Sequence, residues 1–202
     1  MRNILIILAH PNLANSQINK ALINTVENAV AENDKVTIHD LYLTYPDGVI
    51  DIHAEQKKLH TADVVIFQHP FYWYSSPALL KEWFDLVLQF NYAYGPKGTA
   101  LKGKQWLSVI TTGGSKFAYG TEGHNRFTIR QLLTPFDQTA YLCQMEFLPP
   151  FVAHSARTLG KTPERLKEIC EQYESFVIEL LDDNFDSNSV SHLETLNQRW
   201  EQ

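Results

Sequence analysis

Short apolar runs of strand length alternate along this chain with longer segments of helical period, and no other feature restricts the fold as much. Runs rich in Val, Ile, Leu or aromatic residues predict strands at residues 3–9, 35–40, 63–68, 105–111 and 139–145. Strands that alternate with helices form parallel sheets, because each parallel connection needs a crossover long enough to hold a helix. The pattern therefore predicts an α/β fold of three layers, with helices on both faces of a five-stranded parallel sheet.

Helices are predicted at residues 16–32, 53–62, 77–89, 125–136 and 163–181. Pro77 stands at a first helical position, where its missing N–H has no helical partner to lose. In the last helix apolar residues recur at spacings of three and four, so one stripe is expected to lie on the sheet. Residues 1–182 are expected to form one domain. The polar, acidic residues 183–202 are expected to be a docking helix or a partly ordered tail.

The composition is that of a soluble globular protein, since 44% of the 202 residues are hydrophobic and 20% are charged. The 17 Lys and Arg against 23 Asp and Glu give a formal charge of −6 without any basic cluster, which argues against a nucleic-acid partner. The apolar run at residues 4–9 is too short to span a bilayer and has no signal-peptide cleavage region after it. A cytoplasmic protein is therefore expected.

The two cysteines belong to no metal-binding or C-x-x-C pattern. Cys143 falls in a predicted strand and Cys170 in a predicted helix. Both are expected to be reduced residues in or near the core, and no metal site is predicted.

Four successive aromatic residues follow the third predicted strand, namely Phe71, Tyr72, Trp73 and Tyr74. A loop normally avoids several adjacent rings, because their apolar faces would lie in water. The rings could pack under a neighbouring loop or at a subunit contact. Their place at the carboxyl end of a strand favours a planar ligand, because open α/β sheets bind ligands there.

The loop after the first predicted strand ends in Ser16, Gln17, Ile18 and Asn19, where a helix should begin. Backbone N–H groups at a helix start carry partial positive charge and can bind a phosphate, assisted here by the Ser16 and Asn19 side chains. The alternative is that Asn15 or Ser16 only caps the helix. Glycine-rich nucleotide-binding patterns are absent from this loop.

The loop after the fourth predicted strand contains two threonines and two glycines, Thr111, Thr112, Gly113 and Gly114. Glycines let a backbone approach a ligand closely, and threonine hydroxyls can bond to polar ring edges, although a plain turn would also explain the pair. Together the three loops predict a flat heteroaromatic ligand with one phosphate on a flexible arm. Flavin mononucleotide (FMN) is such a molecule.

The same loops carry a resemblance to a known family, together with two further segments. The motifs are Ala9-His10-Pro11, Ser16-Gln17-Ile18-Asn19, Gln68-His69-Pro70-Phe71-Tyr72-Trp73-Tyr74, Lys81-Glu82-Trp83-Phe84-Asp85, Tyr92-Ala93-Tyr94-Gly95 and Thr111-Thr112-Gly113-Gly114. The chain resembles the NAD(P)H:quinone oxidoreductase family of flavodoxin-like flavoproteins from Ile4 to about Leu180. It is most similar to the soluble ancillary oxidoreductases of glutathione-gated potassium-efflux antiporters.

The resemblance implies a flavodoxin-like sheet of strand order 2-1-3-4-5 and an FMN cofactor, in preference to FAD. The implied cofactor-binding residues are His10, Ser16, Gln17, Ile18 and Asn19 at the phosphate, Phe71, Tyr72, Trp73 and Tyr74 along the ring, and Thr111, Thr112, Gly113 and Gly114 at its polar edge. Two electrons would pass as hydride from NAD(P)H through the flavin to a quinone.

Tyr119 and His124 are the implied catalytic residues, as donors to the reduced flavin. Tyr119 stands at the family's distance from Thr-Thr-Gly-Gly, whereas His124 comes one residue early, so His124 is left between a chemical role and a plain loop residue. The resemblance also implies a homodimer.

Two other functions remain open. One is a regulatory protein that docks on a glutathione-gated membrane potassium-efflux antiporter and uses the flavin site as a structural or sensing element. This role would place the chain peripherally on the inner membrane. The other is a flavodoxin-like electron carrier.

Overall fold

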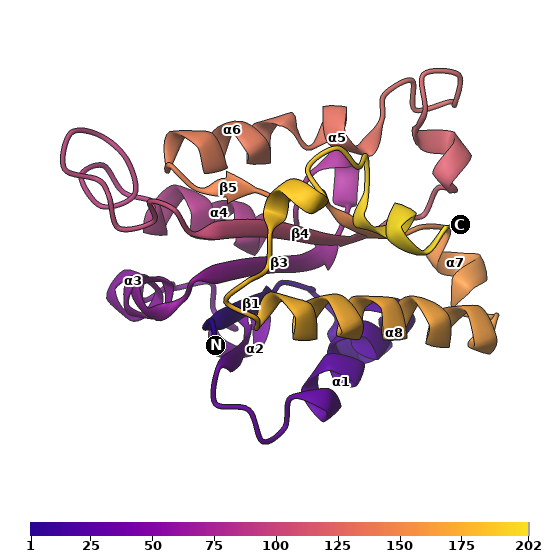
Figure 1. Ribbon diagram of the computed structural model, residues 1–202, viewed down its shortest axis with the longest axis horizontal. Coiled ribbons are helices and arrows are strands. Elements are labelled where there is room, and N and C mark those ends of the chain that lie inside the picture. The colour runs from indigo at the N-terminus through magenta and orange to yellow at the C-terminus, as the bar shows by residue number, and fades with distance from the viewer. Residues whose placement is uncertain (202) are drawn as a thin grey trace.

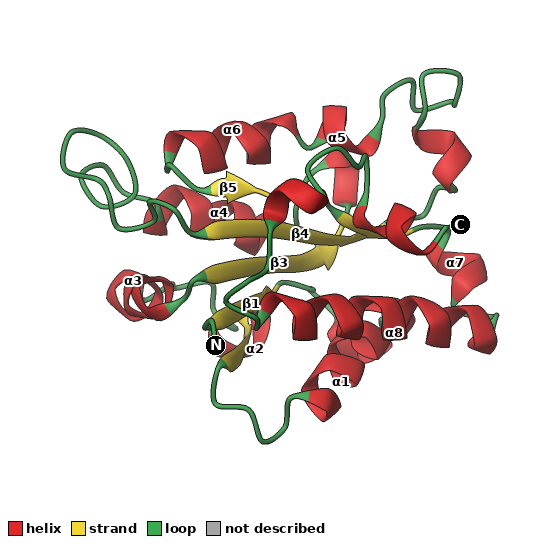
Figure 2. Ribbon diagram, viewed as in Figure 1, coloured by secondary structure: helices red, strands yellow, loops and turns green. Residues whose placement is uncertain are grey.

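A computed structural model describes residues 1–201 and shows a twisted sheet between two layers of helices (Figures 1 and 2). The strand order is β2-β1-β3-β4-β5, with β6 also pairing with β4. Every pair of strands is parallel. The strands are β1 (Ile4–Leu8), β2 (Val36–Asp40), β3 (Val64–Pro70), β4 (Gln105–Thr111), β5 (Glu146–Phe147) and β6 (Phe151–Ala153). The predicted fold class and strand order are confirmed.

The helices form the two outer layers. They are α1 (Gln17–Ala29), α2 (Leu41–Thr44), α3 (Ile52–Thr61), α4 (Ala78–Val87), α5 (Ile129–Leu132), α6 (Thr134–Leu142), α7 (Ala156–Leu159) and α8 (Pro163–Leu180). Helices α1 and α8 pack on one face of the sheet, where Leu22 and Phe176 join the core. Helices α3, α4 and α6 contribute buried residues such as Leu59 and Trp83 to the opposite face.

The central strand β1 shows why the sheet must be covered on both sides. Ile4 and Ile6 point into the core shared with α1 and α8, while Leu5 and Ile7 point into the core shared with α4. Alternate residues of a strand point to opposite faces, so a strand that is apolar throughout needs a helix layer on each face.

The prediction of a strand at residues 139–145 is wrong. Most of this run belongs to α6, in which Phe136, Ala140 and the following Cys143 are buried at spacings of four and three. A short apolar run fits a buried helix as well as a strand, and here the helical spacing decides. Cys143 therefore lies at the end of a helix; like Cys170 in α8, it is a free, buried thiol.

The fifth strand position is instead shared by β5 and β6, which pair with successive parts of β4. Pro149 and Pro150 separate the two, because proline has no N–H to give to the sheet. The helix predicted at residues 125–136 is also shorter than expected: α5 begins only at Ile129, after the capping residue Thr128.

The segment 183–201 packs along β6 and contains two 3-10 turns, Ser187–Ser189 and Leu196–Trp200, but no α-helix. Leu196 N donates to Pro150 O at 2.9 Å, and Val152 N donates to Asn197 Oδ1 at 2.8 Å. These bonds occupy backbone groups at a sheet edge that would otherwise be open. A docking role for this segment remains a prediction. Within residues 1–201 no helix has the length and apolar character needed to cross a membrane.

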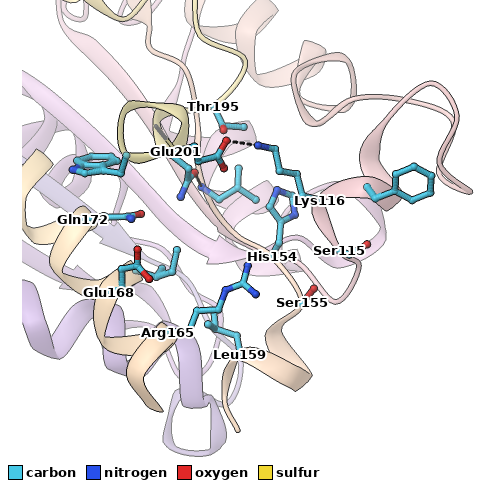
Figure 3. A pocket seen from close by; sticks show the side chains of 15 residues that line it. Ser115, Lys116, His154, Ser155, Leu159, Arg165, Glu168, Gln172, Thr195 and Glu201 are labelled. Carbon is cyan, nitrogen blue, oxygen red and sulfur yellow. Dashed lines mark hydrogen bonds and ion pairs between the residues drawn. The ribbon is translucent and has the colours of Figure 1, made fainter. Parts of the chain in front are cut away.

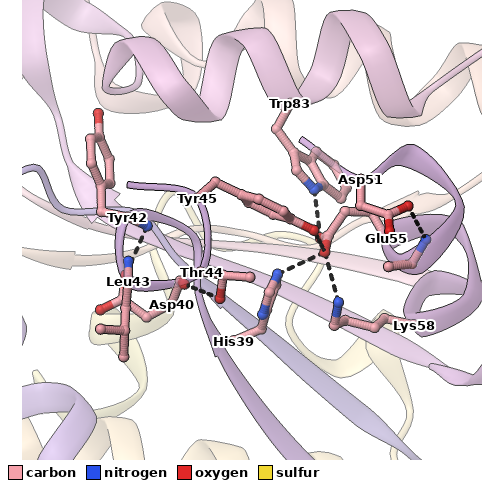
Figure 4. Close-up of polar contacts among 11 residues, drawn as sticks. His39, Asp40, Tyr42, Leu43, Thr44, Tyr45, Asp51, Glu55, Lys58 and Trp83 are labelled. Carbon is pink, nitrogen blue, oxygen red and sulfur yellow. Dashed lines mark hydrogen bonds and ion pairs between the residues drawn. The ribbon is translucent and has the colours of Figure 1, made fainter. Parts of the chain in front are cut away.

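A buried carboxylate joins α3 to its neighbours (Figure 4). Glu55 Oε1 accepts hydrogen bonds from Tyr45 Oη and Lys58 Nζ, both at 2.7 Å, and Oε2 accepts from Trp83 Nε1 at 2.8 Å. His39 Nε2 lies 2.9 Å from Oε1. Burial alone would raise the pKa of Glu55, but these donors outweigh it and lower the pKa to about 2. The ionised carboxylate thus ties together β2, α3 and α4.

Candidate functional site

A cavity of about 370 Å³ opens where the carboxyl ends of β1, β3 and β4 meet. In open parallel sheets ligands bind at this edge, between neighbouring strands whose connections run to opposite faces. The lining residues come from the loops after these three strands and from α7: His10, Asn15, Ser16, Gln17, Ile18, Asn19, Pro70, Phe71, Tyr72, Thr111, Thr112, Gly113 and Ala156. Most of the residues predicted from the three loops are thus brought together.

The first wall is the start of α1. Ser16 is the capping residue, and its hydroxyl accepts from Asn19 N at 3.3 Å. The predicted capping role of Ser16 is therefore observed. Capping leaves the N–H groups of Gln17 and Ile18 without partners within the helix, because the first turn has no preceding carbonyls. Both residues line the cavity, so the positive end of the helix adjoins it.

His10 adds a neutral donor to this wall. Its Nδ1 accepts a hydrogen bond from Asn12 N at 3.0 Å. Burial lowers the pKa of His10, with a smaller opposing effect from Asp40, so the ring is neutral at pH 7. A neutral imidazole that accepts at Nδ1 carries its proton on Nε2. His10 can therefore donate to a ligand oxygen from Nε2.

Asn19 connects the first and third walls. Its side chain is 1% exposed, and Nδ2 donates to Thr111 Oγ1 at 3.0 Å. Gln68 Nε2 donates to the backbone oxygen of Asn19 at 3.0 Å. Asn19 Oδ1 is buried and accepts no hydrogen bond from residues 1–201. Because a buried acceptor without a partner is costly, this atom is suited to a hydroxyl group of a ligand.

The aromatic loop divides into two parts. Phe71 is buried and Tyr72 half-exposed, and both line the cavity. Trp73 and Tyr74 do not line the cavity. The Trp73 residue is 92% exposed, and Tyr74 Oη donates a hydrogen bond to Asn125 Oδ1 at 3.1 Å. Both residues have positive φ, 50° and 62°, a backbone conformation that residues other than glycine adopt rarely. Their predicted contact with the ring of a cofactor stays a prediction.

The third wall follows β4. Thr111, Thr112 and Gly113 line the cavity, whereas Gly114 is not among the lining residues. Thr112 Oγ1 donates to Gly114 O at 2.9 Å and lies 3.1 Å from His154 Nδ1. A Cβ on Gly114 would come within 3.0 Å of the Tyr119 ring, so the absence of a side chain lets Tyr119 pack there.

Tyr119 and His124 lie in different surroundings. The Tyr119 ring is half-buried against Phe71, with ring centroids 6.3 Å apart, and burial raises its pKa. His124 is exposed and is not among the residues that line the cavity. The geometry therefore brings Tyr119 beside the aromatic wall but leaves His124 apart, and the chemical role of each stays a prediction.

The sequence prediction missed Asn15, Pro70 and Ala156 as lining residues, since Asn15 was considered only as a possible helix cap. Pro70 directly precedes the aromatic residues and could have been included with them. Ala156 belongs to α7, and its N–H donates to Thr112 O at 2.9 Å. No local signal marks it, because the contact depends on how the chain returns after β6.

Comparison with known proteins agrees with this geometry. The family described as having a flavodoxin-like fold matches residues 2–177. The potassium-efflux ancillary protein KefG of Serratia proteamaculans is 45% identical over 170 residues, which cover 84% of this chain and 90% of that protein.

Two solved structures are also similar. General stress protein 14 of Treponema denticola, in complex with FMN, is 35% identical with a TM-score of 0.81, over 88% of this chain and 99% of that one. An NADPH-quinone reductase of P. pentosaceus is 32% identical with a TM-score of 0.75. The match covers 86% of this chain and 96% of that one. This chain therefore belongs to the flavodoxin-like family.

Proposed function

We propose that this chain is an FMN-dependent NAD(P)H:quinone oxidoreductase. The observation that carries the proposal is the cavity at the carboxyl ends of β1, β3 and β4, whose walls differ in chemistry: helix-start N–H groups, aromatic rings, and a polar edge of threonine and glycine. The FMN complex of the Treponema protein and the quinone reductase of P. pentosaceus support it.

The residues present fit FMN. Gln17 N, Ile18 N and His10 Nε2 would hold the phosphate, since all three are donors and the helix start favours an anion. Asn19 Oδ1 would accept from a hydroxyl of the ribityl arm. Phe71 and Tyr72 would lie along the ring, and Thr112 and Gly113 at its polar edge. When bound, FMN would supply the two-electron redox chemistry, and the chain's part is to position it.

We assign Tyr119 the role of a donor beside the ring. Because burial raises the pKa of Tyr119, its hydroxyl stays protonated at neutral pH and can donate a hydrogen bond. Replacing Tyr119 by Phe should lower kcat for quinone reduction while FMN affinity changes little. His124→Ala should have the smaller effect, because His124 is exposed.

The test is spectroscopic. Purified protein should be yellow or become so with FMN, and the released cofactor should have the mass of FMN. Under anaerobic conditions NAD(P)H should bleach the flavin absorbance, and one equivalent of quinone should restore it. A protein that takes up no FMN would exclude the proposal. A stable one-electron form during a redox titration would favour the electron carrier instead.

A second candidate function rests on the 45% identity to KefG. The chain would act as an ancillary protein of a membrane potassium-efflux antiporter and associate with the membrane through it. Co-purification with such an antiporter, and its persistence in a variant that binds no FMN, would support this role.

A homodimer is proposed as well. Trp73, Phe90 and Phe127 are large and exposed in the single chain, and a second copy would cover apolar surface of this kind. Sedimentation that shows only monomer at micromolar concentration would contradict it.

A further inference from the structure

A second cavity, of about 400 Å³, lies on the other side of the loop after β4 (Figure 3). Its walls are this loop, the end of β6, α8, and the segment 195–201. It shares no lining residue with the first cavity. None of its residues has a role in the proposed function. A ligand in this cavity would therefore be separate from the proposed cofactor and its substrates.

Nitrogen donors from separate elements line this cavity, among them Lys116, Arg165 and Asn197. Lys116 comes from the loop after β4, Arg165 from α8 and Asn197 from the last 3-10 turn. Arg165 points toward His154 and forms no ion pair with any side chain of residues 1–201. Asn197 is 7% exposed and uses Oδ1 to accept from Val152 N, which leaves its amide nitrogen available as a donor. The cavity thus offers two cations and a neutral donor.

A carboxylate of the chain itself already lies there. Glu201 accepts a hydrogen bond from Lys116 Nζ, and Figure 3 shows this pair across the cavity. The two side chains are 57% and 43% exposed, so the pair is screened by water and adds at most about 1 kcal/mol. A carboxylate from solution could therefore replace that of Glu201 at Lys116, in the same cavity to which Arg165 adds a second cation that is unpaired among residues 1–201.

His154 lines the second cavity and is half-buried. Burial is the first cause that lowers the pKa of His154, to about 4, and Lys116 and Arg165 lower it further against the opposing effect of Glu201. His154 also lies 3.1 Å from Thr112 Oγ1, which lines the first cavity.

The other lining residues determine which kind of group can carry the carboxylate of a ligand. Phe117, Leu159 and Trp200 supply apolar surface, and the carboxylate of Glu168 faces inward and opposes a second negative charge. Ligand sites commonly combine an apolar lining with a few placed polar groups. We propose that the second cavity binds a small monocarboxylate with an aromatic or aliphatic body, whose carboxylate displaces that of Glu201 from Lys116 and is also attracted by Arg165, which has no ion-pair partner among residues 1–201.

The test uses benzoate as the probe and neutral benzamide, which has the same shape, as the control ligand. Amide signals of the ¹⁵N-labelled full chain, with excess FMN present, are followed during titration at constant ionic strength. Benzoate should shift the signals of Lys116, His154 and Asn197 saturably, and benzamide should not. Because the signals are read residue by residue, a failure to bind FMN leaves this test valid.

Variants make the test specific. Arg165→Gln should weaken the binding of benzoate about tenfold, since the substitution removes a charge-assisted hydrogen bond. Glu201→Gln should increase the affinity for benzoate about threefold, because the competing carboxylate is removed. Lys167→Gln is the matched control: Lys167 is also an exposed cation of α8, but it pairs with Glu171 and does not line the cavity.

Four outcomes would overturn the proposal. One is the absence of saturable shifts at Lys116, His154 and Asn197. Another is equal binding of benzoate and benzamide. The third is equal weakening by Arg165→Gln and Lys167→Gln. Shifts confined to Asn19 and Thr111 would place the probe in the first cavity and would also overturn it.

Discussion

Asn19 Nδ2 donates a hydrogen bond to Thr111 Oγ1 across 92 positions of the chain, and this bond joins the loop after β1 to the end of β4. The bond fixes the distance between two walls of the first cavity. It also orients Asn19 Oδ1, the buried acceptor without a partner among residues 1–201. Cofactor binding should therefore depend on a side chain that has no charge and no redox chemistry.

Asn19→Ala should weaken FMN binding about tenfold, because one hydrogen bond to the cofactor and one between the walls are lost. Quenching of flavin fluorescence on titration measures the affinity. Asn24→Ala is the control, since Asn24 is an exposed residue of the same helix. Equal affinities of the two variants would contradict the assignment of Asn19.

His10→Ala should weaken the binding of FMN about tenfold. The binding of riboflavin, which has no phosphate, should stay nearly unchanged. The reason is that Nε2 of His10 is assigned to the phosphate alone. Burial lowers the pKa of His10, so the ring of the cofactor-free protein is neutral at pH 7 and offers the proton on Nε2 to the phosphate. An equal loss for FMN and riboflavin would place His10 elsewhere on the cofactor.

Gly114→Ala and Gly113→Ala should differ in stability. A Cβ on Gly114 meets the Tyr119 ring at 3.0 Å, whereas a Cβ on Gly113 meets nothing within 4 Å. The first change should therefore lower the free energy of unfolding by about 1 kcal/mol through displacement of the ring, and the second should not. Urea unfolding of both variants without cofactor gives the comparison. A Gly113 variant that is the less stable one would refute this account.

Trp73→Ala should leave the free energy of unfolding within about 0.5 kcal/mol of the unchanged protein, because the side chain is 92% exposed. If the ring covers the cofactor or the quinone, FMN affinity or KM for quinone should change nonetheless. Tyr141→Ala, at another exposed aromatic residue, is the control and should alter neither. A large loss of stability with unchanged FMN affinity would show that Trp73 serves packing instead.

Glu55→Gln should change how stability depends on pH. The pKa of Glu55 is lowered from 4.5 to about 2, so its ionised form stabilises the folded chain fully above about pH 4.5. This contribution is lost as the pH falls from 4.5 toward 2, because the unfolded chain binds the proton more tightly. The Gln variant should lose about 3 kcal/mol at pH 7 and show a flatter decline below pH 4.5. Glu27→Gln, on an exposed part of α1, should follow the unchanged protein in thermal unfolding.

Much of the fold was contained in local patterns of the sequence. Runs such as residues 63–68 are apolar on both faces, and such strands need helices on either side of a parallel sheet. The start of α1 at Gln17 could be predicted because Ser16 has the side chain of a cap. Residues 139–145 could not be assigned in this way, because apolar runs of this length fit both a strand and a buried helix.

Both the sequence and the tertiary structure determined the composition of the site. The sequence alone placed Ser16–Asn19, Phe71 and Thr111–Gly113 in the connections that follow the first, third and fourth strands, and the parallel order of the sheet then brings them to one edge. Only the tertiary structure decided that Trp73 turns outward, that Ala156 completes the wall, and that Lys116, Arg165 and Asn197 meet in a second cavity. The physical reason is range: capping and hydrophobic periodicity act between neighbours in the chain, whereas these contacts join residues tens of positions apart, whose distance is set by how the helices pack.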